Sequence, residues 1–402
     1  MKIVNTIIVI LILSGGSLLA QNAIPAGQSL PDSSGQSLFG RFFLTGNGFI
    51  SYQKSINQNN SSWFPALYPI LIAKFSNKLF FESELAIEQS EGKTNIEMEY
   101  ATLHFILNKF FSIGAGKFLS PFGTYQERLH PTWVNKFSEV PLGFSHDGVM
   151  VGPMSEVGIE TRGGSPFGSS KINYAVYLSN GPALNTTTTD SMMTGMLEYG
   201  NFIDNNKNKA LGGRIGFLPF SNSSLELGFS RQNAKVGDEK DSLYKNAKAA
   251  MHGFDLNYVK SIPHLKGILD MKGQYNHVMI DKTNKGNSSM DSMNTSSGMY
   301  DISQAYYVQI AFRPAFVKNK IIQKMELAGR FSAIHTSEKG MLNDNKNQIS
   351  VGLNYWFGWR TVLKLDYQFL KTKGGENESA FLVQLAVAHP KIKFKKTKEE
   401  NK

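Results

Sequence analysis

The chain is built from recurring segments of about ten residues in which apolar and polar side chains alternate, and this pattern constrains the fold most. Such alternation is typical of β-strands whose two faces meet different surroundings. An even number of strands is what a closed antiparallel barrel in an outer membrane requires. The sixteen predicted strands are 39–53, 65–75, 79–89, 94–107, 110–119, 147–162, 170–179, 208–218, 224–232, 249–261, 266–278, 300–313, 321–335, 347–357, 359–371 and 378–389.

The connections between these segments alternate in length along the chain. The tight set is 77–78, 108–109, 163–169, 221–223, 262–265, 314–320 and 358. The interleaved set is mostly longer and more polar: 55–64, 90–93, 120–146, 180–207, 233–248, 279–299, 336–346 and 372–377. Short turns on one rim and long loops on the other match the periplasmic and extracellular ends of outer-membrane barrels. The sequence therefore predicts an all-β, 16-stranded antiparallel transmembrane β-barrel of the porin type.

The two faces of the predicted strands differ in a way that suits lipid outside and water inside. In 364–370, Lys364, Asp366 and Gln368 share one face, and the aromatic and aliphatic residues between them share the other. A polar face repeated around sixteen strands indicates a wet lumen, because a closed barrel pairs its backbone groups internally and can turn its apolar face to lipid. The phase shifts near Tyr100, where we expect a β-bulge.

Composition excludes several classes of protein. With no cysteine, the chain has neither disulfides nor thiolate chemistry. The net charge of +10 includes six Lys and two Glu in 391–402, and elsewhere acids and bases interleave, so nucleic acid is not an expected partner.

The ends of the chain carry their own signals. Residues 1–20 combine Lys2, an apolar run and a small-residue stretch ending at Ala20, which predicts a secretory signal peptide. We expect 21–38 to be a short periplasmic segment, 39–390 the barrel and 391–402 a basic C-terminal tail. The expected location is the outer membrane of a bacterial cell.

The loop 120–146 is the main candidate for a functional element. Three prolines stiffen it, and long loops without structure of their own are usually functional or disordered. We expect it to fold inward and narrow the pore; the alternative is an exposed surface loop. Its candidate constriction residues are Arg128, His130, Trp133, Lys136 and Glu139.

The candidate lumen charges are mixed in sign, and rings of one sign are what set pore selectivity. An acidic band on two neighbouring strands, including Glu88, would attract cations; the alternative is neutralisation by lumen bases. Inward Gly212, Gly216, Gly228, Ala328 and Ala388 indicate open space in the lumen. The candidate lumen charges are Arg41, Glu82, Glu84, Glu97, Glu99, Arg162, Arg214, Lys272, Arg330, Lys364 and Asp366.

Catalytic and metal-binding patterns are weak in this sequence. His130 and His146 share the long loop with acidic residues, but nothing has the spacing of HisGluXaaXaaHis, and no nucleophile elbow occurs. The chain is therefore not predicted to be an enzyme, and neither a metal nor a cofactor is expected.

Two motifs carry a resemblance to a known family. GlyLysPheLeuSerProPheGly (116–123) leaves a strand to open the long loop, and GluMetGluTyrAla (97–101) lies just upstream. Together they resemble the phosphate-selective porin O/P-like family, with motif likeness over 97–162. The resemblance implies a trimeric outer-membrane channel with an inward-folded third loop. The arginine ladder of the phosphate-selective members is not found here, because the lumen bases are scattered.

The function predicted from the sequence is passive diffusion of small polar or charged solutes, with anions such as phosphate among them, through an outer-membrane channel. The expected partners are outer-membrane lipid, the solutes and two further copies in a homotrimer. The alternative is a non-conducting barrel that acts in adhesion or as a surface scaffold, with 180–207 and 279–299 as binding loops. An outer-membrane hydrolase is a third, less favoured reading.

Overall fold

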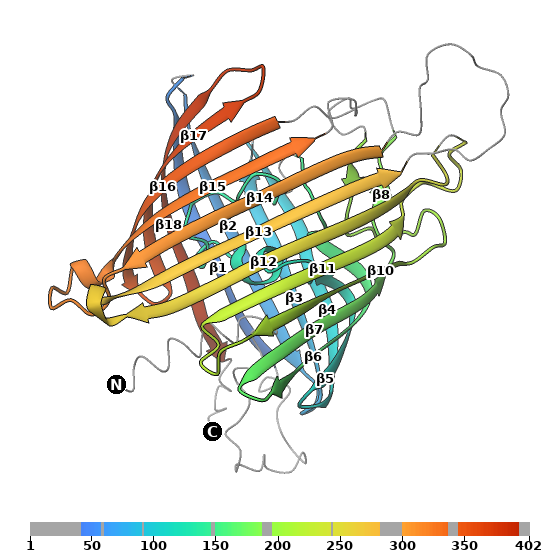
Figure 1. The fold of residues 1–402 in the computed structure, drawn as a ribbon, viewed down its shortest axis with the longest axis horizontal. Helices are drawn as coiled ribbons and strands as arrows, with labels where there is room; N and C mark the ends of the chain where they lie inside the picture. The colour runs from blue at the N-terminus through green and yellow to red at the C-terminus, as the bar shows by residue number, and fades with distance from the viewer. Residues whose placement is uncertain are drawn as a thin grey trace, which may run out of the picture.

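The computed structural model describes residues 42–57, 60–90, 92–145, 149–186, 195–242, 244–281, 300–336 and 345–393. These residues form one closed antiparallel barrel of sixteen strands (Figure 1). Its strands are β1 (Phe42–Ser55), β2 (Ser61–Lys74), β3 (Leu79–Ser90), β4 (Lys93–Asn108), β5 (Phe111–Leu119), β6 (Ser155–Phe167), β7 (Ser170–Ser179), β10 (Ala210–Leu218), β11 (Leu225–Lys235), β12 (Lys248–Ile262), β13 (Gly267–Asp281), β14 (Tyr300–Arg313), β15 (Met325–Thr336), β16 (Asn345–Gly358), β17 (Thr361–Thr372) and β18 (Glu378–Lys393).

The remaining elements are small. β8 (Ala183–Leu184) and β9 (Leu197–Glu198) form a separate two-stranded sheet in the connection after β7. A π-helical turn, η3 (Tyr125–Leu129), lies in the connection after β5, and the 3₁₀ turns η4 (Pro263–Leu265) and η5 (Ile322–Lys324) lie in two short connections. Among the described residues, no helix is both long and apolar enough to cross a membrane.

The barrel closes where β1 pairs with β18, in a register that places Ile50 opposite Leu385. The predicted architecture and strand number are confirmed, and most strand ends differ from the prediction by a few residues. The largest difference is at β6, which begins at Ser155 rather than 147 and continues to Phe167. The preceding residues belong to the loop because Val151 is buried and its carbonyl accepts a hydrogen bond from Asn276, 2.7 Å away.

The limits of the barrel also differ slightly from the prediction. β18 continues to Lys393, so the first three residues of the predicted basic tail belong to a strand. The predicted signal peptide 1–20 and the segment 21–38 lie outside the described residues, as do most of the predicted tail and most of the loop 279–299.

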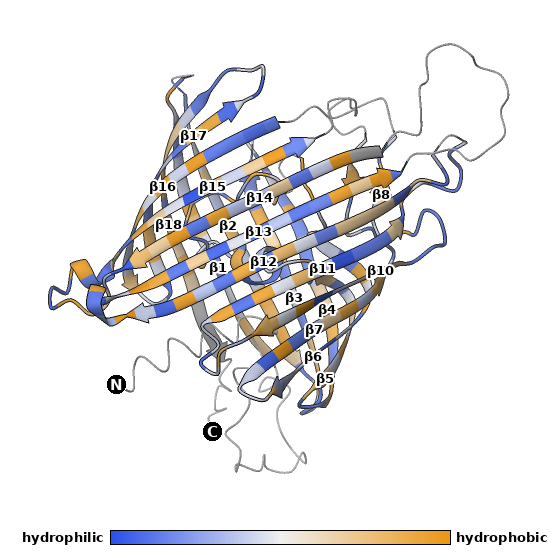
Figure 2. Ribbon diagram, viewed as in Figure 1, coloured by the Kyte–Doolittle hydropathy of each residue, from blue (hydrophilic) through white to orange (hydrophobic). Residues whose placement is uncertain are grey.

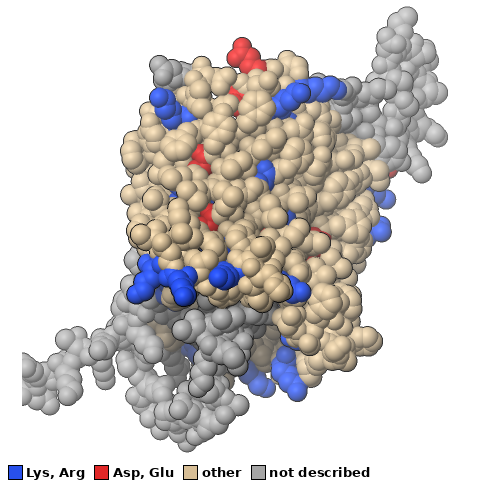
Figure 3. Space-filling view, turned by 60° about the vertical axis from the view of Figure 1, so that its left-hand side comes forward, with Lys and Arg blue, Asp and Glu red and all other residues tan. Residues whose placement is uncertain are grey.

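The strands show the predicted split between an apolar outer face and a polar inner face. On β16, Ile349, Val351 and Leu353 are exposed outside, and the intervening Ser350 and Asn354 are buried inside. Hydropathy accordingly alternates along the strands in Figure 2, and Figure 3 shows few charged side chains across the middle of one outer surface. An apolar outer face on a closed 16-stranded barrel is the architecture of a bacterial outer-membrane β-barrel.

A β-bulge interrupts β4 one residue from the predicted position. Glu84 pairs with Tyr100 and the next residue, Leu85, pairs with Met98, so Glu99 is the extra residue. A bulge shifts the alternation of the strand by one residue. Downstream of it Tyr100 lies opposite Glu84, and upstream Glu97 lies opposite Ala86, so both remain on the inner parity.

Candidate functional site

The connection between β5 and β6, residues 120–154 and here called the inner loop, contacts inward-facing side chains of the barrel wall. Near its start, the backbone N–H of Gly123 donates to Ser230 Oγ of β11 over 2.9 Å, and the N–H of Thr124 donates to Gln274 Oε1 of β13 over 2.9 Å. Further along, Thr132 Oγ1 lies 3.1 Å from Asn47 Oδ1 of β1. At these described positions the inner loop therefore lies against the inner face of the barrel wall.

An apolar face of the inner loop packs against the extracellular half of the wall. Phe122, Tyr125 and Phe144 are almost fully buried, and they share a core cluster with Tyr307 and with residues of β10–β15. The Phe144 and Tyr307 rings meet edge to face at 5.2 Å. Burial also raises the pKa of Tyr125 above its ordinary value, so its hydroxyl stays protonated. These contacts fill part of the lumen on that side.

The π-helical turn η3 presents two opposite charges to two different strands. Glu127 forms an ion pair with Arg162 of β6, which also pairs with Glu160 of the same strand. Arg128 Nη1 lies 2.7 Å from Glu226 Oε2 of β11. Successive side chains of a helical turn do not face each other, so Glu127 and Arg128 reach different strands.

The pair at Arg128 belongs to a larger network on the inner wall. Arg214 of β10 places Nη2 2.9 Å from Glu226 Oε1 and 2.7 Å from Asp255 Oδ1. Glu226 is thus shared between one loop base and one wall base. Because each charge has a partner at hydrogen-bonding distance, the network satisfies buried charges that would otherwise be costly.

Lys136 connects the tip of the inner loop to β13 and β15. Its Nζ lies 2.9 Å from Glu326 Oε2 and 3.6 Å from Asp270 Oδ2. Asp270 also pairs with Lys272. Burial alone would lower the pKa of Lys136, but the two carboxylates raise it above its ordinary value. Lys136 therefore stays charged at neutral pH.

Two wall bases hold the backbone of the inner loop rather than a carboxylate. Lys364 Nζ donates to the carbonyl oxygens of Thr132 and Phe137, the latter 3.0 Å away. Arg330 Nη1 donates to the carbonyl of Glu139 over 2.9 Å, and its guanidinium lies 4.6 Å from the centre of the Phe137 ring.

Other polar side chains of the wall also form hydrogen bonds with the backbone of the loop tip. Asp366 accepts the backbone N–H of Ser138, and Asn354 Nδ2 donates to the carbonyl of Lys136 over 3.0 Å. Lys364 and Asp366 have no exposed surface, because the loop tip covers them. The tip is thus attached to four consecutive strands, β15–β18, the last through Gln384 Nε2, which donates to the Ser138 carbonyl over 3.2 Å.

The inner wall at β3 and β4 has a different composition. The hydrogen-bond partners of its glutamates include tyrosines: Tyr100 donates to Glu82 over 3.2 Å, and Tyr68 of β2 donates to Glu88. Among the described residues, Glu84, Glu88 and Glu99 take part in no ion pair. We call Glu82, Glu84, Glu88, Glu97 and Glu99 the acidic wall.

The remaining predicted loop residues have local partners. The His130 ring Nδ1 lies 2.8 Å from the carbonyl oxygen of Gln126, and Trp133 packs edge to face against Trp359 at 6.5 Å. Burial raises the pKa of Glu139, although the charge of Arg330 opposes this. Arg41 and His146 lie outside the described residues. Within the described residues, no group of three or more His, Cys, Asp or Glu is placed to hold a metal ion.

The prediction that small inward residues leave open space is wrong at three glycines. A Cβ at Gly212 would fall 2.2 Å from the Tyr177 ring, and one at Gly216 or Gly228 would collide with the side chains around Arg214. These glycines make room for neighbouring side chains of the wall. Sequence reasoning also missed Gln274 and Asn354 as partners of the inner loop, although their inward parity was a usable signal.

Comparison with known proteins identifies the fold. DcaP, an outer membrane channel of Acinetobacter baumannii, superposes with a TM-score of 0.56 at 13% identity, over 88% of this chain and 99% of its own. An anion-selective porin from Comamonas acidovorans gives 0.52 at 13% identity, over 86% and 98%. Salmonella typhi OmpF, in complex with daunomycin, gives 0.51 at 12% identity, over 88% and 99%.

These likenesses show that the chain has the fold of outer-membrane porins. No family model matches the sequence, and no curated protein matches it. The resemblance to the phosphate-selective porin O/P-like family therefore stays a prediction.

Proposed function

We propose that the protein is an outer-membrane channel for the passive diffusion of small polar or charged solutes, narrowed by the inner loop. The observation that carries this proposal is the attachment of one long loop, inside the barrel, to polar side chains of β1, β6, β11–β13 and β15–β18. A loop fixed in this way narrows the lumen of a 16-stranded barrel. It does not close the lumen as a separate plug domain would. Such a channel sieves solutes by size and charge.

The distribution of charge favours cations over anions. The bases Arg128, Lys136, Arg162, Arg214 and Lys272 each have a carboxylate partner within ion-pair distance. On the acidic wall, Glu84, Glu88 and Glu99 have no such counter-charge among the described residues. A wall of one sign raises the local concentration of the opposite ion. Anion passage, phosphate included, is the competing outcome.

The test is conductance of the purified barrel in a planar bilayer, with the reversal potential measured across a salt gradient. Stable open steps with cation preference would support the proposal. Open steps with anion preference would support the channel but not its cation selectivity, and the anion preference would then be attributed to the bases of the inner loop. Heat-modifiable migration on a gel would show that the purified barrel is folded. If such folded protein formed no channels, the channel proposal would be refuted.

A second candidate function is a non-conducting barrel that acts as a surface scaffold or in adhesion. It is favoured by the extent to which the inner loop covers the wall at β15–β18, where Lys364 and Asp366 have no exposed surface. The bilayer experiment separates the two, because a scaffold would conduct no ions. Assembly as a homotrimer and lack of enzymatic activity remain parts of the proposal, supported by the porin fold.

A further inference from the structure

A row of polar side chains crosses the outer surface of the barrel on five neighbouring strands, β11–β15. Direct cross-strand pairs link Arg231 to His252, His252 to His277, His277 to Gln304 and Gln304 to His335. Directly paired residues share a face of the sheet. We call these five residues the polar row.

The polar row faces outward. Its strand neighbours Met251, Gly253, Asn276, Val278 and Ala305 are buried on the inner side, whereas Arg231 is exposed and the other four are partly exposed. The rings of His252 and His277 lie 6.3 Å apart.

An aromatic row lies directly below, one outward position nearer the periplasm. It consists of Phe229, Phe254, Tyr275 and Tyr306, which are again direct cross-strand partners. The Phe229 and Phe254 rings lie 5.1 Å apart, and the Tyr306 ring lies 6.1 Å from that of His335. Aromatic side chains next to polar ones are typical of the boundary between lipid tails and headgroups.

The apolar outer face is narrow on β12. On β12, three outward residues, Phe254, Leu256 and Tyr258, separate His252 from Lys260, which is the next polar position toward the periplasm. On β16, by contrast, the five outward positions from Ile349 to Phe357 are all apolar or aromatic.

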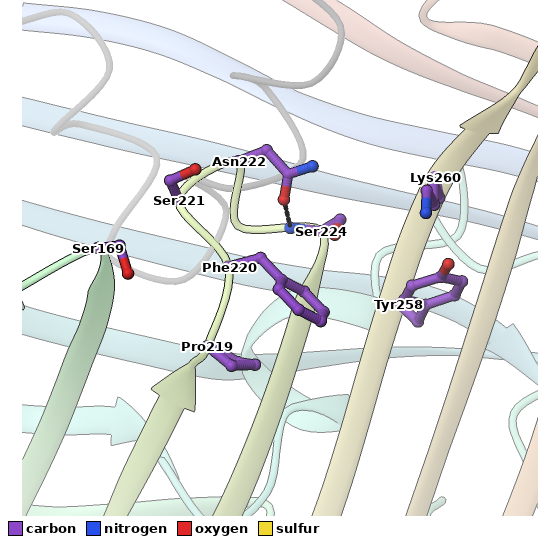
Figure 4. A pocket seen from close by; sticks show the side chains of 8 residues that line it. All are labelled: Ser169, Pro219, Phe220, Ser221, Asn222, Ser224, Tyr258 and Lys260. Carbon is purple, nitrogen blue, oxygen red and sulfur yellow. Dashed lines mark hydrogen bonds between the residues drawn. The ribbon is translucent and has the colours of Figure 1, made fainter.

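Lys260 and Tyr258 mark the periplasmic boundary of β12. They line a hollow of about 590 Å³ together with Phe220 and three serines of the neighbouring connections, and Figure 4 shows their side chains beside the 219–224 turn. On β12, His252 is thus three outward residues from that boundary. A base facing hydrocarbon is destabilising, most of all near the bilayer midplane, so the row calls for a polar partner at its own depth.

The charge of this surface identifies the partner's chemistry. At the extracellular ends of β11 and β12, Lys235 and Lys248 pair across the strands on the same outward parity as Arg231. Among the acidic residues of the described barrel strands, Asp281, opposite Lys248, is the one with outward parity. The outer face of a second barrel would therefore offer the polar row almost no carboxylates. Membrane lipids, by contrast, carry phosphate groups.

We propose that the outer face of β11–β15 binds the phosphate-bearing headgroup of a lipid in the outer leaflet. Arg231 and the histidines donate hydrogen bonds to phosphate oxygens. These bonds are charge-assisted and therefore stronger than bonds between neutral groups. The aromatic row packs beneath against the upper part of the acyl chains. The site is independent of ion conduction through the lumen.

The test uses the full-length barrel, delipidated in detergent, and titrates it with bis-phosphorylated lipid A under native mass spectrometry. We expect binding that is at least about ten-fold weaker for lipid A without its phosphates, since one charge-assisted contact is worth about 1.5–3 kcal/mol. Excess inorganic phosphate should not displace the lipid. Equal binding of both lipids would overturn the proposal, and this comparison needs no variant.

The variant Arg231→Gln/His252→Gln should lose the preference for the phosphorylated lipid. The matched control is Lys371→Gln, which removes an exposed outward base near the extracellular end of β17 and should bind as the parent does. If the double variant binds lipid normally but dissociates an oligomer in size-exclusion chromatography with light scattering, the surface joins copies of the chain and the lipid proposal fails.

Discussion

The two sides of the lumen use charge differently. On the wall formed by β10–β18, acids and bases are paired with each other or with the inner loop, as at Arg214–Asp255 and Lys136–Glu326. On the acidic wall, carboxylates accept from tyrosine hydroxyls instead, as at Tyr68 and Glu88. The same kind of inward charge thus attaches the inner loop on one wall and lies beside tyrosine hydroxyls on the other, where Glu82, Glu84 and Glu99 are also buried.

The largest expected effect comes from breaking the attachment at Lys136. Lys136→Met leaves Glu326 and Asp270 without the loop base, and removing one partner of a buried ion pair costs about 3–5 kcal/mol. We expect the inner loop to detach and Arg128 to become a site of rapid tryptic cleavage in the folded barrel.

Two further variants make this prediction specific. The control Lys171→Met removes an inward lysine whose ammonium donates to Ser223 at the periplasmic end, and it should leave the loop protected. Adding Glu326→Gln to Lys136→Met should recover part of the lost stability. No change in cleavage for Lys136→Met would show that this pair does not hold the loop.

A smaller effect is expected from Lys364→Met, because Lys364 holds the loop through carbonyl oxygens. Losing these bonds leaves neutral carbonyl groups, and not a buried carboxylate, without a partner, so the cost is smaller than at Lys136. With the tip released, single-channel conductance should rise and fluctuate more than in the parent. Unchanged conductance with the barrel still folded would mean that the tip does not narrow the pore.

On the opposite wall, Glu88→Gln/Glu99→Gln should shift the reversal potential toward anions while leaving the loop attached. One charge acting at about 10 Å through water contributes about 0.4 kcal/mol, so ion occupancy should fall about two-fold for each charge removed. Glu376→Gln, an equal charge loss in the exposed connection after β17, is the control and should have little effect. An unchanged reversal potential in the double variant would remove the acidic wall from selectivity.

The smallest effect concerns pH and Glu139. Burial raises the pKa of Glu139 above its ordinary 4.5, so the folded protein favours the neutral form. Stability from this group is therefore complete below pH 4.5 and declines as the pH rises through the raised pKa. Glu139→Gln should melt slightly higher than the parent at neutral pH and equally at pH 4, as followed by circular dichroism. A lower melting temperature at pH 7 would contradict the assigned direction.

Much of the barrel was predictable because its signals are local. Alternation along 364–370 separated Lys364 and Asp366 from the apolar residues between them, and the phase shift near Tyr100 located the bulge to within one residue. The start of β6 was not predictable in this way. Val149–Met154 has strand-like composition, but Val151 is held inside the barrel by Asn276, which is 125 residues away in the chain.

The number of strands and the alternation that separates polar from apolar side chains follow from the sequence alone, because each depends on neighbours along the chain. Only the tertiary structure decided which charges meet. Arg128 finds Glu226 and Lys136 finds Glu326 because barrel closure and the path of the loop bring them together from distant strands. Pairing across a lumen is set by distance in space, which a period of two along a strand does not encode.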